Sequence, residues 1–321
     1  MTEQEIREAL PTEAVGRVKT ITLKDATATL VVDASGLSRP DAEALEAAIR
    51  ARIERLEGID AARVALMADK VTRRIVAVGS GKGGVGKSTL TANLAVALAR
   101  MGRKVGVVDA DVYGPSQPML LDAENQRPQA REQTLLPVET EFGIRLLSMG
   151  QLVEPGRAIA WRGPMVGSAL GQMMDADWGD AEVLLVDLPP GTGDVQLTML
   201  QKFRPAGAVI VTTSQDLALI DATRAINLFK QAGVPIVGLV ENMAGYVCPH
   251  CGESSDPFGS GGAEAAAGSL GETFLGRVPL ATEIREASDA GQPPAASDAP
   301  QGQAFAAIAE RLAAWLDETG R

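Results

Sequence analysis

The chain has 321 residues, of which 45% are apolar and only 3% aromatic, and its formal net charge is −11. This length suits one large domain, or one domain with a small appendage, around a mainly aliphatic core. Its acidity argues against non-specific DNA binding and against docking on an anionic membrane, because both need basic surfaces. The N-terminal MTEQEIREAL lacks the pattern of a signal peptide, and no apolar run approaches the roughly 18 residues of a membrane span. We therefore expect a cytoplasmic protein that binds neither nucleic acid nor membrane.

Residues 1–70 read as a small α+β domain. The stretches VGRVKTITL, ATATLVVDA and RVALMA predict three short strands. Between the last two, residues 41–56 carry Leu45, Ile49, Ile53 and Leu56 at helical spacing. The segment has no cysteine, histidine or cluster of carboxylates, which favours a binding or regulatory module over a catalytic one.

Residues 71–321 predict an α/β domain with a mainly parallel sheet covered by helices on both faces. Short valine-rich runs at 73–80, 104–111, 181–191, 207–214 and 234–242 alternate with helical stretches, as buried parallel strands do. We expect an exposed loop at 122–135, a flexible stretch at 291–302 and a final helix at 305–318. In that helix, Leu312, Trp315 and Leu316 are expected to pack on the core.

A phosphate-binding loop follows the first of these strands. The sequence GKGGVGKS, from Gly81 to Ser88, fits the P-loop pattern G-x-x-x-x-G-K-[ST], and a helix is predicted from Ser88 to Arg100. Glycines let successive backbone N–H groups surround phosphate oxygens, and the following helix directs its positive end at the anion. Lys87 is expected to reach the β- and γ-phosphates, and Ser88 to bind Mg²⁺. A guanine-reading NKxD motif is absent, which favours ATP.

Three aspartates follow predicted strands. Asp109 and Asp111 end VVDAD, and Asp187 ends VLLVD, so all three are expected at the sheet edge that faces ligands. Asp187 suits a Walker-B role in holding Mg²⁺, and Asp111 suits orienting or deprotonating the attacking water. Gly191 and Gly193 would let the next loop move with the γ-phosphate.

The only two cysteines, Cys248 and Cys251, flank the only histidine, His250, in VCPHCGE. A C-x-x-C pair can be a redox pair, a zinc site or half of an iron–sulfur site. Thioredoxin-like pairs open a helix, whereas the glycines after this pair predict a loop. A two-fold dimer would supply four thiolates, which suit either a [4Fe–4S] cluster or zinc.

Lys82, directly after the first glycine of the P-loop, resembles the deviant Walker A motif of the MinD/ParA/nitrogenase-reductase superfamily. Further stretches resemble the Mrp/ApbC family of iron–sulfur cluster carriers: GKGGVGKS, DADVYGPS, WRGPM, VDLPPGTGD, ENMAGYVCPHCGE, FGSGGA, and GRVPL followed by IREASDAG. They extend from Arg74 to about Gln292. The N-terminal domain resembles an assembly-factor domain but lacks its usual cysteine and Asp-Pro-Glu turn, and Ser214 stands where the family commonly has proline.

The resemblance implies a homodimer that binds and hydrolyses ATP and delivers a [4Fe–4S] cluster to apo iron–sulfur proteins. Cys248 and Cys251 would carry the cluster, Lys82 would reach the partner's nucleotide, and Asn242 would contact the adenine. Catalysis would fall to Lys82, Lys87 and Asp111. The nucleotide and its Mg²⁺ would be held by Gly81, Lys82, Gly83, Gly84, Val85, Gly86, Lys87, Ser88, Thr89, Asp109, Asp187 and Asn242.

Two other functions fit parts of the sequence. One is a positioning ATPase of the MinD/ParA type, although the C-terminal helix is not basic as membrane-seeking helices of that type are. The other is a nucleotide-dependent scaffold bridged by zinc. Metal analysis of protein purified without oxygen separates the zinc scaffold from the cluster carrier.

Overall fold

The computed structural model describes residues 2–35, 37, 39–67, 73–153 and 163–319, with only the backbone described for Arg39 and Pro40. Trp161 and Arg162 of the WRGPM motif lie outside the described residues. Contacts divide the chain into two compact units, Met1–Thr72 and Arg73–Arg321, and each has a hydrophobic core of its own.

The N-terminal unit is a three-stranded sheet with two helices. Its elements are α1 (Glu3–Glu8), β1 (Val18–Lys24), β2 (Thr27–Asp33), α2 (Arg39–Ile53) and β3 (Ala61–Met67). Strand β2 is central, antiparallel to β1 and parallel to β3. The three strands lie where the alternating sequence patterns predict them. Ile49 and Ile53 of α2 are fully buried with Leu30 of β2, so burial of one helix face holds the helix on the sheet.

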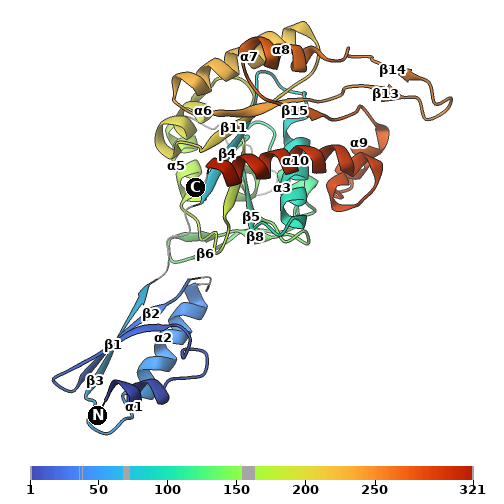
Figure 1. The fold of residues 1–321 in the computed structure, drawn as a ribbon. Helices are drawn as coiled ribbons and strands as arrows, with labels where there is room; N and C mark the ends of the chain where they lie inside the picture. The colour runs from blue at the N-terminus through green and yellow to red at the C-terminus, as the bar shows by residue number, and fades with distance from the viewer. Residues whose placement is uncertain (1, 36, 38, 68–72, 154–162, 320–321) are drawn as a thin grey trace. The chain divides into compact units, whose positions relative to one another are not determined.

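The larger unit is built on an eight-stranded sheet in the order β15-β12-β11-β4-β10-β5-β9-β8 (Figure 1). Neighbouring strands are parallel except for the edge pair β8–β9, which confirms the predicted mainly parallel sheet. The strands are β4 (Arg74–Ser80), β5 (Val105–Asp109), β8 (Val138–Glu139), β9 (Arg145–Ser148), β10 (Val183–Asp187), β11 (Gly207–Thr212), β12 (Ile236–Glu241) and β15 (Phe274–Arg277).

Helices cover both faces of this sheet. They are α3 (Lys87–Arg100), α4 (Gln117–Leu120), α5 (Gly163–Met174), α6 (Asp194–Thr198), α7 (Asp216–Gln231), α8 (Gly262–Leu270), α9 (Thr282–Asp289) and α10 (Pro300–Thr319). A π-turn follows α6 at Met199–Phe203, and short 3-10 helices lie at Met149–Leu152 and Pro294–Ala296. Along β4, Val76 and Val78 belong to one hydrophobic cluster and Ala77 to another. Because successive side chains of a strand point to opposite faces, these are the two faces of the sheet.

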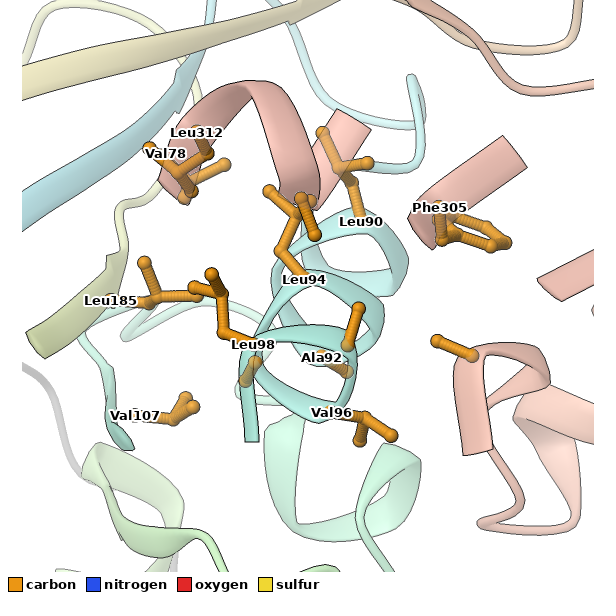
Figure 2. Close-up of a cluster of buried hydrophobic side chains, with 14 of the residues drawn as sticks. Val78, Leu90, Ala92, Leu94, Val96, Leu98, Val107, Leu185, Phe305 and Leu312 are labelled. Atoms are coloured by element: carbon orange, nitrogen blue, oxygen red, sulfur yellow. The ribbon is translucent and has the colours of Figure 1, made fainter. Parts of the chain in front are cut away.

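The first cluster packs α3 and α10 against the sheet (Figure 2). Leu90, Leu94 and Leu98 recur every four residues of α3 and are buried with Leu312 of α10. Burying each such leucine stabilises the fold by about 1.5–3 kcal/mol. Leu316 is also buried and Trp315 packs against the cluster, as predicted for this helix. This packing fixes α3, and with it the P-loop, on the sheet.

Two predictions for connecting segments were wrong. Residues 122–135 are not all loop, because Gln129–Arg131 (β6) and Thr134–Leu136 (β7) form a short hairpin. The stretch 291–302 is not irregular throughout: it contains the 3-10 helix Pro294–Ala296 and the first residues of α10, and Pro294 and Ala295 are buried. The amide of Ala295 donates a 2.9 Å hydrogen bond to Asn93 of α3, which anchors the stretch. Proline suits the first turn of a helix, so Pro300 begins α10 instead of breaking it.

Candidate functional site

The P-loop connects β4 to α3, and its backbone requires glycine at several points. Gly84 and Gly86 have φ of +80° and +82°, which side chains rarely tolerate. A Cβ on Gly81 would lie 2.1 Å from the backbone carbon of Asp221 in α7. Gly86 is the N-cap of α3, and no described side chain caps that helix. The first N–H groups of α3 can therefore bind an anion.

A buried ion pair lies directly behind this loop. Lys87 Nζ is 2.5 Å from Asp187 Oδ1 and 3.8 Å from Asp111 Oδ2, and 3.3 Å separate it from Ser88 Oγ. The Lys87 side chain is 6% exposed and that of Asp187 is fully buried. The structure thus brings together the P-loop lysine, the predicted magnesium-binding serine and two of the three predicted aspartates.

Asp109 and Asp187 sit opposite each other on the adjacent parallel strands β5 and β10. Asp109 is fully buried, and burial together with the negative charge of Asp187 raises its pKa to about 7. Three hydrogen bonds to the Asp109 carboxylate oppose this rise in pKa. They come from the backbone N–H groups of Gln117 and Asp111 and from the hydroxyl of Ser148. One lysine cannot neutralise two buried carboxylates, so Asp109 retains a proton more readily than an ordinary aspartate does.

Sequence reasoning missed two polar residues of this cluster. The Gln117 side chain donates to Asp187 Oδ2 at 2.9 Å and to the Ser88 carbonyl at 3.0 Å, which connects the strand end to the P-loop. The Gln117 Oε1 atom is buried and has no partner in the described part of the chain. Ser148, at the end of β9, donates to Asp109 Oδ2 at 2.9 Å. The only sequence signal for Gln117 is its position directly after DADVYGPS.

Lys82 and the 191–193 loop are both hydrogen-bonded to Ser80, at the end of β4. The carbonyl of Lys82 accepts the Ser80 hydroxyl at 3.0 Å, while its ammonium forms no ion pair within the described ranges. Gly191 has φ of +86°, and its amide donates to the Ser80 carbonyl at 2.9 Å. The loop after Asp187 is thereby tied to the end of β4 by the backbone.

Asn242 links the P-loop to the segment with the cysteines. It follows β12, and its Nδ2 donates a 2.8 Å hydrogen bond to the carbonyl of Val85. A Cβ on Gly86 would lie 2.0 Å from this nitrogen, so the contact requires glycine there. The preceding residue, Glu241, is buried and accepts the amides of Gly261 and Ala263 at the start of α8. Sequence reasoning did not identify Glu241, which holds the FGSGGA segment to β12.

Cys248 and Cys251 lie in a hairpin between β13 (Tyr246–Val247) and β14 (Ser254–Ser255), where a loop was predicted. The backbone amide of Cys248 donates to the Glu253 carbonyl at 2.9 Å, and the backbone amide of Gly252 donates to the Cys248 carbonyl at 2.8 Å. Amides of Cys251 and His250 donate to the Cys248 sulfur and lower its pKa, which favours the thiolate. Cys251 is exposed. Within the described part of the chain, no group of three or more acidic, histidine or cysteine residues could hold a metal ion.

The chain has a mainly parallel sheet, a P-loop between β4 and α3, and aspartates at the carboxyl ends of β5 and β10. These features define a P-loop NTPase. The family model of ParA: NUBPL iron-transfer P-loop NTPases matches residues 71–313. The chain belongs to this family.

Characterised relatives and solved structures agree with that assignment. The chain is 50% identical over 229 residues to the iron–sulfur cluster carrier protein of Pseudomonas fragi, covering 70% of this chain and 79% of the relative. It is 52% identical over 222 residues to the iron–sulfur protein required for NADH dehydrogenase, mitochondrial, of Arabidopsis thaliana, covering 68% and 70%. The nucleotide-binding protein from Archaeoglobus fulgidus, in complex with ADP, has a TM-score of 0.61 and 39% identity, covering 68% of this chain and 86% of that one. MinD from Pyrococcus horikoshii with Mg-ADP has a TM-score of 0.58 and 26% identity, covering 77% and 99%.

Proposed function

We propose that this protein is an ATP-binding and ATP-hydrolysing carrier that holds a [4Fe–4S] cluster between two identical subunits and transfers it to apoproteins. The observation that carries the proposal is the exposed hairpin with Cys248 and Cys251, which begins a few residues after the P-loop contact of Asn242. Family membership and relatives named as iron–sulfur cluster carriers support it.

ATP binds through the P-loop backbone and the start of α3 in this proposal. The left-handed glycines and the uncapped helix N-terminus form a cradle for phosphate oxygens. Lys87 exchanges part of its contact with Asp187 for the β- and γ-phosphates. The Ser88 hydroxyl and the carboxylates of Asp109 and Asp187 are hard oxygen donors gathered at one point, and they fit Mg²⁺. When bound, Mg²⁺ would neutralise phosphate charge.

Asp111 is the residue that we assign to the attacking water. Its Oδ1 accepts the amides of Tyr113 and Gly114 at 3.1 and 3.2 Å, and its Oδ2 points toward Lys87 at 3.8 Å. One oxygen is thus fixed by the turn, which orients the other toward the phosphate end of the site. In addition to Asp111, Lys82 acts on the nucleotide of the partner subunit. Its ammonium stabilises negative charge on the transferred phosphate.

A dimer supplies the ligands that one chain lacks. Each hairpin offers two thiols, and a [4Fe–4S] cluster needs four ligands. The large unit also exposes apolar side chains next to the P-loop: Leu217 is 72% and Ile220 50% exposed on α7, whose backbone packs on Gly81. Exposed apolar groups beside the nucleotide suit contact with a second copy. The two-fold axis of such a dimer would place the two hairpins opposite each other at the interface. It would also place each Lys82 near the nucleotide of the partner subunit.

The positioning ATPase is the second candidate because of the likeness to MinD. It is disfavoured because α10 uses its apolar side chains, including Phe305, Ile308 and Leu312, in the core. As a separate finding, none of the helices in the described part of the chain combines the length and the apolar composition of a membrane span. A zinc-bridged scaffold would use the same four thiols, so metal identity must decide between zinc and a cluster.

The test is anaerobic reconstitution with iron and sulfide, followed by metal analysis and visible absorption. The proposal expects iron and sulfide in equal amounts, a broad visible absorption band from sulfur-to-iron charge transfer, and transfer of both iron and sulfide to an added apoprotein. Protein that contains zinc as purified and takes up no iron during this reconstitution contradicts it.

A further inference from the structure

Gln117 contacts both acidic strand ends and the P-loop. Its backbone N–H donates to Asp109 Oδ2 at 3.1 Å, and its side-chain Nε2 donates to Asp187 Oδ2 at 2.9 Å. The same Nε2 donates to the carbonyl of Ser88 at 3.0 Å, and Gln117 is fully buried. One neutral residue therefore joins the ends of β5 and β10 to the start of α3, at the point where the proposed Mg²⁺ would bind.

The orientation of the Gln117 side-chain amide is fixed by its neighbours. The carboxylate of Asp187 and the carbonyl of Ser88 are acceptors, so the nitrogen with its two hydrogens must face them. Oε1 then faces the other way. This oxygen is buried and has no hydrogen-bond partner among the described residues. Because a buried polar atom without a partner costs free energy, Oε1 identifies a place where a donor is required.

The side-chain donors of the same cluster are directed at other acceptors. The Lys87 ammonium is paired with Asp187. The Ser148 hydroxyl donates to Asp109 at 2.9 Å, and the Thr91 hydroxyl donates to the Lys87 carbonyl at 3.0 Å. No group in the described part of the chain donates to the glutamine oxygen, so the donor must come from outside the chain.

Mg²⁺ brings donors of this kind to a site. It usually keeps several water molecules when carboxylates and phosphates bind it, and the hydrogens of these waters point away from the cation. We propose that Gln117 is a positioning residue for Mg²⁺: the hydration shell of the cation donates a hydrogen bond to Oε1, while Nε2 holds Asp187 in place. This inference rests on the proposed binding of ATP with Mg²⁺. A residue that accepts from the water shell and also orients a carboxylate supports the metal without touching it.

The first experiment measures ADP binding to the full-length protein by isothermal titration, once with Mg²⁺ and once with EDTA. ADP is used because no turnover follows its binding. Gln117→Met keeps an unbranched side chain of similar length but removes both polar atoms. Its ADP affinity with Mg²⁺ should fall by about tenfold, while its affinity in EDTA stays within about twofold of that of the wild type. An equal loss under both conditions, or no loss with Mg²⁺, overturns the inference.

A second variant, Gln117→Glu, separates the role of Oε1 from the role of Nε2. Glutamate keeps an accepting oxygen in place of Oε1 but loses the N–H groups that hold Asp187. If Oε1 serves the hydration shell, this variant should bind ADP with Mg²⁺ at least as tightly as the wild type, because a carboxylate accepts the same hydrogen bond and adds negative charge. If Gln117 only holds Asp187, glutamate should lose as much affinity as methionine, since two carboxylates repel each other. Affinity no better than that of the methionine variant overturns the role of Oε1.

The matched control is Gln151→Met, the same substitution at another buried glutamine, whose Oε1 already accepts the Ser148 amide at 3.1 Å. This control should keep the wild-type gain in ADP affinity from Mg²⁺, and an equal loss in it would overturn the inference by showing a general loosening of the site. Wild-type protein that binds no ADP under either condition would overturn the proposed ATP binding itself. Normal ADP binding with an unchanged effect of Mg²⁺ in Gln117→Met would overturn only the role of Gln117.

Discussion

Lys87 Nζ lies 2.5 Å from Asp187 Oδ1, and the two side chains are 6% and 0% exposed. The P-loop lysine is thus directed at the end of β10, between the phosphate cradle and the acidic strand ends. Loss of one partner of a buried ion pair typically destabilises a protein by about 3–5 kcal/mol. The pair therefore connects nucleotide binding to the stability of the sheet edge.

Replacing Lys87 by alanine should abolish productive ATP binding and lower ATP turnover by about 10²–10³-fold, because the phosphates lose their main cation. Isothermal titration and phosphate release measure the two effects, with thermal unfolding recorded to confirm that the variant folds. Lys104→Ala is the control. Lys104 is 60% exposed and directly precedes β5, so it lies at the amino-terminal end of the strands, away from the P-loop. Wild-type turnover in the Lys87 variant would rule out this P-loop assignment.

Asp111→Asn should keep ATP affinity near that of the wild type but slow hydrolysis. Asparagine retains a side-chain oxygen that can accept the Tyr113 and Gly114 amides, so the turn is preserved. It cannot accept a proton from water at neutral pH. Nucleotide affinity and single-turnover hydrolysis are compared. An equal loss of both would make Asp111 a magnesium-binding or structural residue.

Asp109 should make stability depend on pH. Its pKa is raised to about 7 in the folded chain from 3.8, so between these values the folded state binds a proton that the unfolded state has released. Stability from this group is therefore present at low pH and is lost as pH rises from about 4 through 7. Asp109→Asn should flatten that dependence. Urea unfolding of metal-free protein from pH 5 to pH 8 tests this, and identical slopes for both proteins would contradict it.

A fragment of residues 73–321 should fold and bind ATP with an affinity within about twofold of the full chain, because the two units have separate cores. Circular dichroism and nucleotide titration check this expectation. A fragment that aggregates or loses nucleotide affinity would show that the first unit supports the ATPase.

Much of the nucleotide site could be predicted because its residues follow continuous buried strands. Asp109 ends VGVVD and Asp187 ends VLLVD, and parallel strands place their carboxyl ends at one edge. The Asn242–Val85 contact joins residues 157 positions apart. The sequence near either residue contains no pattern that predicts this contact.

The missed elements are short or depend on distant packing. Strand β9 has four residues and becomes a strand by pairing with β5. The cysteine hairpin has only two residues in each strand, and its support includes the pairing of Tyr246 with Leu280. The burial of Gln117 likewise follows from where α4 packs, not from its own sequence.

Cys248→Ala should remove metal binding and leave the fold intact, since the hairpin projects from the core and both cysteines are at least partly exposed. The variant dimer would retain only two Cys251 thiols, which cannot hold a four-iron cluster. Iron should fall nearly to background while ATP affinity is unchanged. Pro249→Ala, between the two cysteines, is the control and should retain iron.

Iron stoichiometry in mixed dimers tests the shared cluster most directly. Wild-type chains and Cys248→Ala/Cys251→Ala chains are co-expressed with different tags, separated into the three dimer species and reconstituted without oxygen. The account predicts one cluster per wild-type dimer and none in the mixed dimer, so at equal mixing the iron per wild-type chain falls to about half. Iron that instead follows the number of wild-type chains, with mixed dimers half loaded, would mean that each chain binds its own metal and would contradict the shared cluster.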